Sequence, residues 1–343
     1  MMEQAGTAQS KVPSERGSRF WSVVLRFQSY FGLIAILLLS TLLSPIRDGR
    51  NIFLDPNNLL NIVRFASENG IIAIGMTLVI LIGGIDLSVG AVLALCAVGA
   101  ASFMMRSGLG TAPTILLVLG IGALAGMING LVTTRFNIQS FIVTLAMLSI
   151  ARGVASLWSG GYAIPLAFGD GPDLAPASFK AMFAGSVGLG GINIPVQIFY
   201  FLAAGLIAGV LLKRTAFGRH VYAVGGNETA ARLSGVNVNR VKTIVFTVSG
   251  FLAALAALLH AALVNQGSHI DGNGYELNAI AAVVIGGTSL AGGVGTVVGS
   301  MVGAVILSVL DNILGLRNIA SEYQMILKGM LIVGAVLVQR QKR

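Results

Sequence analysis

The sequence has little charge and almost no cysteine. Only 10% of its 343 residues are charged, 55% are hydrophobic, and the mean hydropathy is +0.86. Soluble globular domains carry roughly 25% charged residues, so the composition excludes an ordinary soluble protein and indicates an integral membrane protein. The one cysteine, Cys96, lies inside an apolar run, which excludes a disulfide framework and a thiolate metal site.

Motifs for catalysis and for nucleotide binding are also missing. No segment matches G-x4-G-K-[ST], the loop that cradles nucleotide phosphates, and no serine or cysteine stands in a nucleophile motif. The histidines, His220, His260 and His269, do not have metal-ligand spacing. We therefore expect a protein that is not an enzyme and that binds no cofactor or metal of its own.

The formal net charge is +9, but the basic residues do not form the continuous basic face of a nucleic-acid-binding protein. They lie in short loops and at the ends of the chain, where they set orientation in a membrane, because cytoplasmic loops are enriched in lysine and arginine. External loops would hold Arg47, Arg50, Arg106, Lys180 and Arg317. With the N-terminus inside, the larger basic set falls in the cytoplasmic segments, so we expect both termini in the cytoplasm. This set is Lys11, Arg16, Arg19, Arg135, Lys213, Arg214, Arg219, Arg232, Arg240, Lys242, Arg340, Lys342 and Arg343.

Apolar runs of about 20 residues predict about ten transmembrane helices. They lie near residues 20–43, 60–82, 87–105, 113–134, 138–158, 195–213, 241–264, 276–291, 296–314 and 323–339. The first run is too long for a signal-peptide core and has no cleavage site after it. We expect an all-α, polytopic bundle with a cytoplasmic tail at 1–19, one transmembrane domain at 20–339 and a cytoplasmic tail at 340–343.

Two glycine-rich segments interrupt the apolar runs and repeat one another. Residues 82–90 and 285–293 share the frame I-G-G-x-x-L-x-x-G. Unpaired peptide groups cost several kcal/mol in lipid, so a helix break survives there only inside a bundle or beside a wet cavity. We expect the breaks to mark a pathway, either as hairpins of two spans or as single discontinuous helices. The candidate residues are Gly83, Gly84, Asp86, Ser88, Gly90, Gly286, Gly287, Ser289 and Gly293.

Ionisable residues in apolar runs are a second clue to function, because an unpaired charge at bilayer depth costs at least a few kcal/mol. We expect Asp86 to cap a helix that begins at Leu87, with Ser289 in the equivalent place, or to take part in gating or substrate contact. Arg64 and Glu68 would pair near a membrane end, and Asp311 would pair with Lys328.

Other small-residue patterns have a simpler interpretation. The spaced glycines Gly122, Gly126 and Gly130 indicate close packing between helices.

Two polar segments are long enough to have a function. The external one, 159–194, carries Asp170, Asp173 and an apolar patch of Phe179, Met182 and Phe183, so it would cap the outer mouth, meet a partner or merely connect two helices.

The internal polar segment, 213–242, contains a short helix with a clear start and stop signal. Its cap is Asn227, its end is Gly235, and Glu228 and Arg232 stand four apart in the favourable order. Its small apolar residues, Ala230, Ala231 and Leu233, suit docking to another protein.

Several segments together resemble the permease subunits of bacterial ABC importers for ribose, xylose, arabinose and related monosaccharides. The resemblance runs from about Asn58 to Val338. It rests on G-M-T-L-V-I-L-I-G-G-I-D-L-S-V-G from Gly75, N-G-L-V-T-T from Asn129, F-I-V-T-L from Phe141, S-I-A-R-G from Ser149, F-G-R-H-V-Y-A-V-G-G-N-E-T-A-A-R-L-S-G from Phe217, and G-G-T-S-L-A-G-G-V-G-T from Gly286. Family members usually have prolines where this chain has Gln139 and Ser140.

The resemblance implies a multi-pass permease of the bacterial inner membrane that works as a homodimer or with a close paralogue. It implies a separate cytoplasmic subunit that uses ATP and Mg, and a periplasmic protein that delivers the sugar. The ATPase would seat on the coupling residues Gly226, Asn227, Glu228, Ala230, Ala231, Arg232, Leu233 and Gly235. A branched-chain amino-acid permease and a self-sufficient secondary transporter remain as alternatives. Substrate candidates chosen by residue type are Asn129, Gln139, Trp158 and Asn278.

Overall fold

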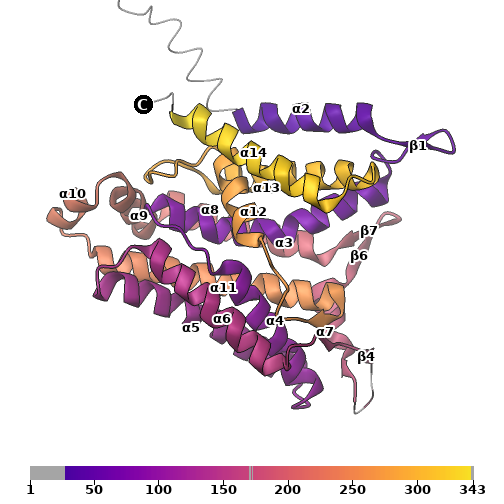
Figure 1. Cartoon of the computed structure of the whole chain (residues 1–343), viewed down its shortest axis with the longest axis horizontal. Coiled ribbons are helices and arrows are strands. Elements are labelled where there is room, and N and C mark those ends of the chain that lie inside the picture. The colour runs from indigo at the N-terminus through magenta and orange to yellow at the C-terminus, as the bar shows by residue number, and fades with distance from the viewer. Residues whose placement is uncertain (1–27, 170, 172, 341–343) are drawn as a thin grey trace, which may run out of the picture.

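The structure, a computed structural model, describes residues 28–169, 171 and 173–340 (Figure 1). The expected N-terminal tail with Lys11, Arg16 and Arg19, the start of the first expected span at 20–27, Asp170, and residues 341–343 lie outside the described residues.

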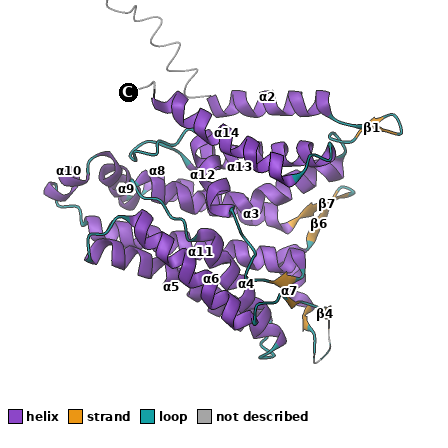
Figure 2. Cartoon of the chain, viewed as in Figure 1, coloured by secondary structure: helices purple, strands orange, loops and turns teal. Residues whose placement is uncertain are grey.

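The described part is built almost entirely of helices, with short strands gathered near one edge (Figure 2). The helices are α2 (Gln28–Leu43), α3 (Pro56–Leu81), α4 (Val89–Met105), α5 (Thr111–Arg135), α6 (Ser140–Ser159), α7 (Ala177–Ala184), α8 (Val196–Arg214), α9 (Ala216–Gly226), α10 (Glu228–Leu233), α11 (Val238–Val264), α12 (Tyr275–Ile285), α13 (Val297–Leu316) and α14 (Ser321–Arg340). Two antiparallel hairpins form from β1 (Ile46–Arg47) with β2 (Arg50–Asn51) and from β6 (Ser186–Leu189) with β7 (Ile192–Pro195). Strand β3 (Ile164–Pro165) pairs antiparallel with β8 (Gln266–Gly267), and β4 (Phe168–Gly169) pairs parallel with β5 (Ala175–Pro176).

Within the described residues, six helices are long and apolar enough to cross a membrane, namely α3, α5, α6, α8, α11 and α13. An all-α polytopic membrane protein is therefore confirmed. Helix α12 has only 11 residues, which span about 16 Å at about 1.5 Å per residue. The hydrocarbon core is about 30 Å thick, so α12 cannot cross it. The expected span at 276–291 is wrong in this respect, because the helix stops at Ile285 and the chain stays non-helical as far as Thr296.

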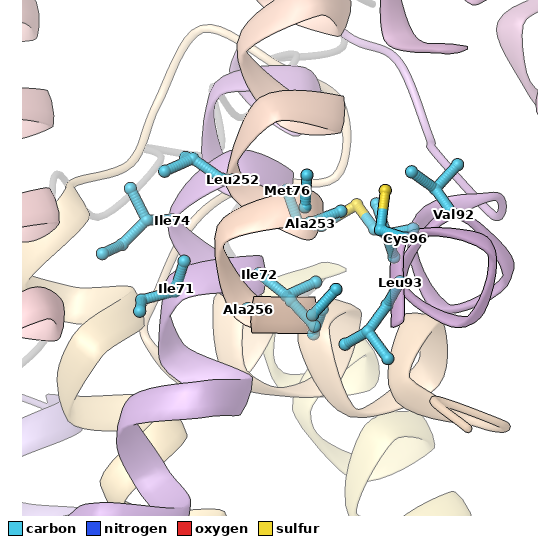
Figure 3. Packing of buried hydrophobic residues seen from close by; sticks show 14 of the residues in the cluster. Ile71, Ile72, Ile74, Met76, Val92, Leu93, Cys96, Leu252, Ala253 and Ala256 are labelled. Atoms are coloured by element: carbon cyan, nitrogen blue, oxygen red, sulfur yellow. The ribbon is translucent and has the colours of Figure 1, made fainter. Parts of the chain in front are cut away.

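Helices α3 and α11 form the centre of the bundle. In their most apolar stretches 78% and 72% of the residues are buried, against 28% in α6 and 33% in α5 and α8, which lie nearer the surface of the bundle. Figure 3 shows how the inner helices meet: Ile72 and Met76 of α3 lie among Cys96 of α4 and Ala253 of α11. Small side chains on α4 and α11 allow this close approach.

Glycines allow a close contact between α5 and α11. A methyl group on Gly126 would lie 2.1 Å from the carbonyl oxygen of Phe246, and one on Gly122 would lie 2.4 Å from that of Gly250. A methyl group on Gly130 would lie 2.6 Å from the Cα of Thr243. The spaced glycines therefore pack helices together, as the sequence predicts.

The expected external segment, 159–194, turns two of its phenylalanines toward the bundle. Phe179 and Phe183 are buried, and Phe183 stacks on Tyr200 of α8 with ring centroids 5.6 Å apart. Of the expected apolar patch only Met182 is exposed. The phenylalanines therefore anchor the segment to the bundle and are not available to an external partner.

Candidate functional site

The first helix break covers residues 82–88, between α3 and α4. The last turn of α3 is closed by the Gly83 N–H, which donates to the Ile80 carbonyl at 2.9 Å, and the Gly84 N–H, which donates to the Val79 carbonyl at 2.9 Å. These two bonds, with φ +76° at Gly83, form the usual glycine end of a helix. The chain leaves the helix sharply at Gly83.

The second break covers residues 286–296, between α12 and α13, and begins in the same way. The Gly287 N–H donates to Val284 at 2.9 Å, the Thr288 N–H donates to Val283 at 3.1 Å, and φ of Gly287 is +89°. Gly83 is therefore the structural counterpart of Gly287. The sequence frame aligns Gly84 with Gly287. It is therefore one residue out of register with the left-handed positions of the two turns, which are Gly83 and Gly287.

Side chains of α6 hold the first break in place. The Ser140 hydroxyl accepts a hydrogen bond from the Ile85 N–H at 3.2 Å, and the Thr144 hydroxyl accepts one from the Leu87 N–H at 3.1 Å. These bonds satisfy amides that have no helical partner. The serine at position 140 thus supplies an acceptor that a proline there would lack.

Asp86 lies at the centre of a buried polar network. Its Oδ1 accepts hydrogen bonds from the Ser88 N–H at 3.0 Å and the Ser88 hydroxyl at 2.6 Å, and its Oδ2 accepts one from Ser249 of α11 at 2.9 Å. Asn129 of α5 donates to the Ser88 hydroxyl at 2.9 Å. Helix α4 begins at Val89 and not at Leu87. Asp86 therefore ties the turn before α4 to α11, and Asn129 belongs to the same network.

Ser289 does not stand at a helix start, contrary to the expected equivalence with Asp86. Its N–H donates to the Val294 carbonyl at 2.8 Å and its hydroxyl accepts from the Ala291 N–H at 3.3 Å, so it closes a turn inside the break. The cap of α13 is Thr296, whose hydroxyl accepts from the Gly299 N–H at 3.1 Å.

The second break is a hairpin. A methyl group on Gly286 would lie 2.5 Å from the Gly299 carbonyl oxygen, and one on Gly303 would lie 2.0 Å from the Ala282 carbonyl oxygen. Contacts move backward along α13 as they move forward along α12, so the two helices run antiparallel.

The two breaks touch one another. The Gly293 N–H, in the second break, donates to the Leu81 carbonyl at the end of α3 at 2.9 Å. Gly90, by contrast, lies in the first turn of α4, where a methyl group would lie 2.2 Å from the Gly272 carbonyl oxygen. It packs α4 against the entry to α12 and is not part of the break.

A polar cavity of about 470 Å³ lies against the first break. It is lined by Ile82 to Ile85, by the turn between α5 and α6, and by the N-terminal part of α11. Of the substrate candidates, Gln139 lines this cavity, together with Asn137, Ser140 and Lys242.

The other substrate candidates lie elsewhere. Asn278 lines a separate cavity of about 400 Å³ with Asn69, Tyr275 and Asp311. Trp158 packs edge-on against Phe103, with ring centroids 5.3 Å apart. The structure therefore does not bring Asn129, Gln139, Trp158 and Asn278 together.

In the expected internal segment, 213–242, the short helix α10 begins and ends where the sequence predicts. The Asn227 side chain accepts a hydrogen bond from the Ala230 N–H at 2.9 Å, and Gly235 has φ +85°. Glu228 pairs with Arg232 at 3.1 Å and also with Lys242 of α11 at 2.6 Å. Burial raises the pKa of Glu228, but the hydrogen bonds and charges of Lys242 and Arg232 outweigh that effect and hold it below its ordinary value.

The exposed face of α10 differs from the expected one at one position. Ala231 is only 5% exposed and packs against the protein, so it is not part of a docking surface. Leu233 is 84% exposed, and Ala230 and Arg232 are exposed beside it. The large exposed apolar side chain of α10 is therefore that of Leu233.

Sequence reasoning missed a buried ionic cluster between α3 and α11. Glu68 pairs with His260 Nδ1 at 2.7 Å, and not with Arg64, while His260 Nε2 lies 3.6 Å from Asp271. Arg152 donates to the Asp271 carbonyl at 2.7 Å. The sequence does indicate such a cluster, because Glu68 and His260 both lie in apolar runs, where an ionisable side chain needs a partner.

The expected pair of Asp311 and Lys328 is present, with the two charged groups 2.9 Å apart. It joins α13 to α14.

Comparison with known proteins accounts for this architecture. The family model described as a branched-chain amino acid transport system, permease component, matches residues 58–336. The ribose import permease RbsC of Haemophilus influenzae is 44% identical, over 90% of this chain and 91% of its own. RbsC of Bacillus subtilis is 40% identical, over 99% of this chain and 98% of its own.

The xylose transport permease XylH of Haemophilus influenzae is 34% identical, over 93% of this chain and 98% of its own. A solved ABC transporter of the metal-chelate type, in an inward-facing conformation, has the same fold, with a TM-score of 0.50 at 17% identity over 93% of this chain and 99% of its own. The chain therefore belongs to the family of ABC transport permeases that includes the ribose and xylose import permeases.

Proposed function

We propose that this chain is the translocation-pathway subunit of an ATP-driven importer that takes up a ribose-type monosaccharide. The substrate class is supported by the relatives, which are named for ribose at 44% and 40% identity and for xylose at 34% identity. The family model carries the name of branched-chain amino acid transport, but these closer relatives favour a sugar over an amino acid.

A separate ATPase subunit supplies the energy and uses ATP and Mg. The observation that carries this proposal is α10, a six-residue helix with its own cap whose Leu233 side chain is 84% exposed. An exposed leucine on a short, well-fixed helix is suited to a hydrophobic contact with another protein. A self-sufficient transporter has no need of such a helix.

The remaining partners follow from the same proposal. A periplasmic binding protein delivers the sugar, and a second permease copy, identical or closely related, completes the pathway. The chain lies in the bacterial inner membrane with both termini in the cytoplasm, as the distribution of basic residues favours.

We place the inner part of the pathway at the cavity of about 470 Å³ against the first break. Gln139 and Asn137 supply amides there that match sugar hydroxyls. A shift of the break would widen or close this cavity, because the Ile82 to Ile85 backbone forms one of its walls.

The role of α10 is tested by Leu233→Glu, which places a charge at the centre of the proposed contact. A charge without a partner in an apolar contact is costly, so the ATPase subunit should co-purify at about one tenth of its normal level or less. Leu189→Glu makes the same change at an exposed position in the external hairpin and should leave co-purification unchanged. Normal co-purification with Leu233→Glu would show that the ATPase does not seat on α10.

A further inference from the structure

We propose that a junction made of glycine backbones transmits movement of α10 to both helix breaks at once. The junction consists of Gly225 in the last turn of α9, Gly292 and Gly293 in the second break, and Leu81 to Gly83 at the first break. This inference rests on the proposed function, in which α10 seats the ATPase subunit. It adds the route by which that contact reaches the pathway.

Gly225 lies directly on both breaks. A methyl group on it would lie 1.7 Å from the Leu81 carbonyl oxygen and 2.6 Å from the Gly293 backbone nitrogen. Both neighbours are backbone atoms, which cannot move aside by changing rotamer. A displacement of α9 at Gly225 must therefore displace the end of α3 and the second break together.

The second break fits against α9 and the first break in the same way. A methyl group on Gly292 would lie 2.9 Å from the Gly225 carbonyl oxygen and 3.0 Å from the Gly83 backbone nitrogen. Gly292 and Gly293 have φ values of +86° and +74°, and the Gly293 N–H bonds to the Leu81 carbonyl at 2.9 Å. Glycine is needed here both for the backbone conformation and for the close approach.

A side-chain bond from α9 also reaches the second break. The Tyr222 hydroxyl, one helical turn before Gly226, donates to the Gly295 carbonyl at 2.9 Å. Helix α9 thus holds the second break at two points, through Tyr222 and through Gly225.

The path from the docking helix to the junction is short. Only Asn227 separates α9 from α10, and its side chain caps α10. Figure 1 shows α10 projecting at one edge of the molecule, with α9 between it and the ends of α3 and α8. A force on α10 therefore acts on the junction through α9.

The test compares two neighbouring glycines. Gly225→Ala forces the backbones of the junction apart, whereas a methyl group on Gly226 meets no atom within 4 Å and its φ is not positive, so Gly226→Ala is the matched control. With the ATPase subunit and the binding protein in proteoliposomes, we expect both variants to retain the ATPase. Gly225→Ala should lose about tenfold or more of its sugar uptake per ATP hydrolysed, and Gly226→Ala should keep normal coupling.

A milder variant keeps the test decisive if Gly225→Ala does not fold. Tyr222→Phe removes the hydrogen bond to Gly295 without adding an atom. We expect it to retain ATPase binding and to reduce uptake per ATP about fivefold, in keeping with a coupling energy near 1 kcal/mol.

A second readout follows the break itself. Ala291→Cys, in a Cys96→Ala background, places a thiol at an exposed position in the second break. Its rate of reaction with a maleimide should change when the ATPase subunit binds nucleotide, and Gly225→Ala or Tyr222→Phe should abolish that change. Normal coupling and a normal nucleotide response in both variants would overturn the junction. Loss of ATPase binding in Leu233→Glu does not depend on the junction, so the two proposals fail separately.

Discussion

At the scale of single residues, Gly83 and Gly287 end α3 and α12 with the same left-handed backbone, at φ values of +76° and +89°. A methyl group on Gly83 would meet only the Ala291 carbonyl oxygen, at 3.9 Å. The constraint at Gly83 is therefore one of conformation and not of space.

Gly83→Ala should lower the free energy of unfolding by about 1–2 kcal/mol, the cost of a left-handed backbone for an L-residue. The measurement is thermal unfolding of the purified permease in detergent. The control is Gly120→Ala, at a glycine of α5 with open space around it, which should leave stability unchanged or raise it by up to about 1 kcal/mol. If the two variants unfold at the same temperature, the left-handed turn at Gly83 carries no strain for alanine.

Residue-level predictions succeeded where the determinants are local. Asn227 caps the start of α10 and Gly235 follows its end, as expected, because a cap depends on the residues next to it. Ala231 was placed on the wrong face, because a helix of six residues has no periodicity long enough to show which side is buried. The partner of Glu68 is His260, 192 residues away, and a single sequence gives no means of pairing residues at that distance.

At the scale of elements, Glu228 attaches α10 to the bundle. Its carboxylate bonds to Lys242 of α11 at 2.6 Å and to Arg232 at 3.1 Å. Because its pKa is depressed in the folded protein, this contribution to stability is fully present above the ordinary glutamate pKa of about 4.3 and is lost as the pH falls below it.

Glu228→Gln should therefore be less stable than the wild type by a few tenths to about 1 kcal/mol, since the pair is partly exposed to solvent. That difference should be constant from about pH 8 to about pH 5 and should shrink below about pH 4.5. Thermal unfolding of both proteins across this range measures it. Lys242→Met, which removes the partner, should reproduce the loss, and a difference that grows toward low pH would contradict the ion-pair account.

The apolar runs gave the positions of the helices well, because a lipid environment demands long apolar segments. The end of α12 was predicted too late. Residues 286–291 are apolar enough to extend a helix by composition, yet Gly287 turns the chain out of it. The hairpin of α12 and α13 depends on contacts between glycine backbones, which no hydropathy pattern records.

At the scale of the whole molecule, the expected orientation places α10 inside the cell and the segment with α7 outside. The native Cys96 is fully buried, so labelling of introduced cysteines in a Cys96→Ala background reports only the new positions.

Leu233→Cys and Met182→Cys place thiols on these two surfaces, at positions 84% and 45% exposed. An impermeant maleimide added to intact cells should label Met182→Cys and not Leu233→Cys, and both should react once the membrane is opened. Labelling of Leu233→Cys from outside would reverse the orientation and would remove α10 from the cytoplasm.

The most direct test of the central claim is sugar uptake by purified components. The permease is reconstituted in proteoliposomes with its ATPase subunit and binding protein, and uptake of labelled ribose and leucine is measured with and without ATP. We expect ribose uptake only when the ATPase subunit and ATP are both present, no leucine uptake, and little ribose uptake by Leu233→Glu. Ribose uptake by the permease alone, driven by an ion gradient and unaffected by Leu233→Glu, would contradict the account.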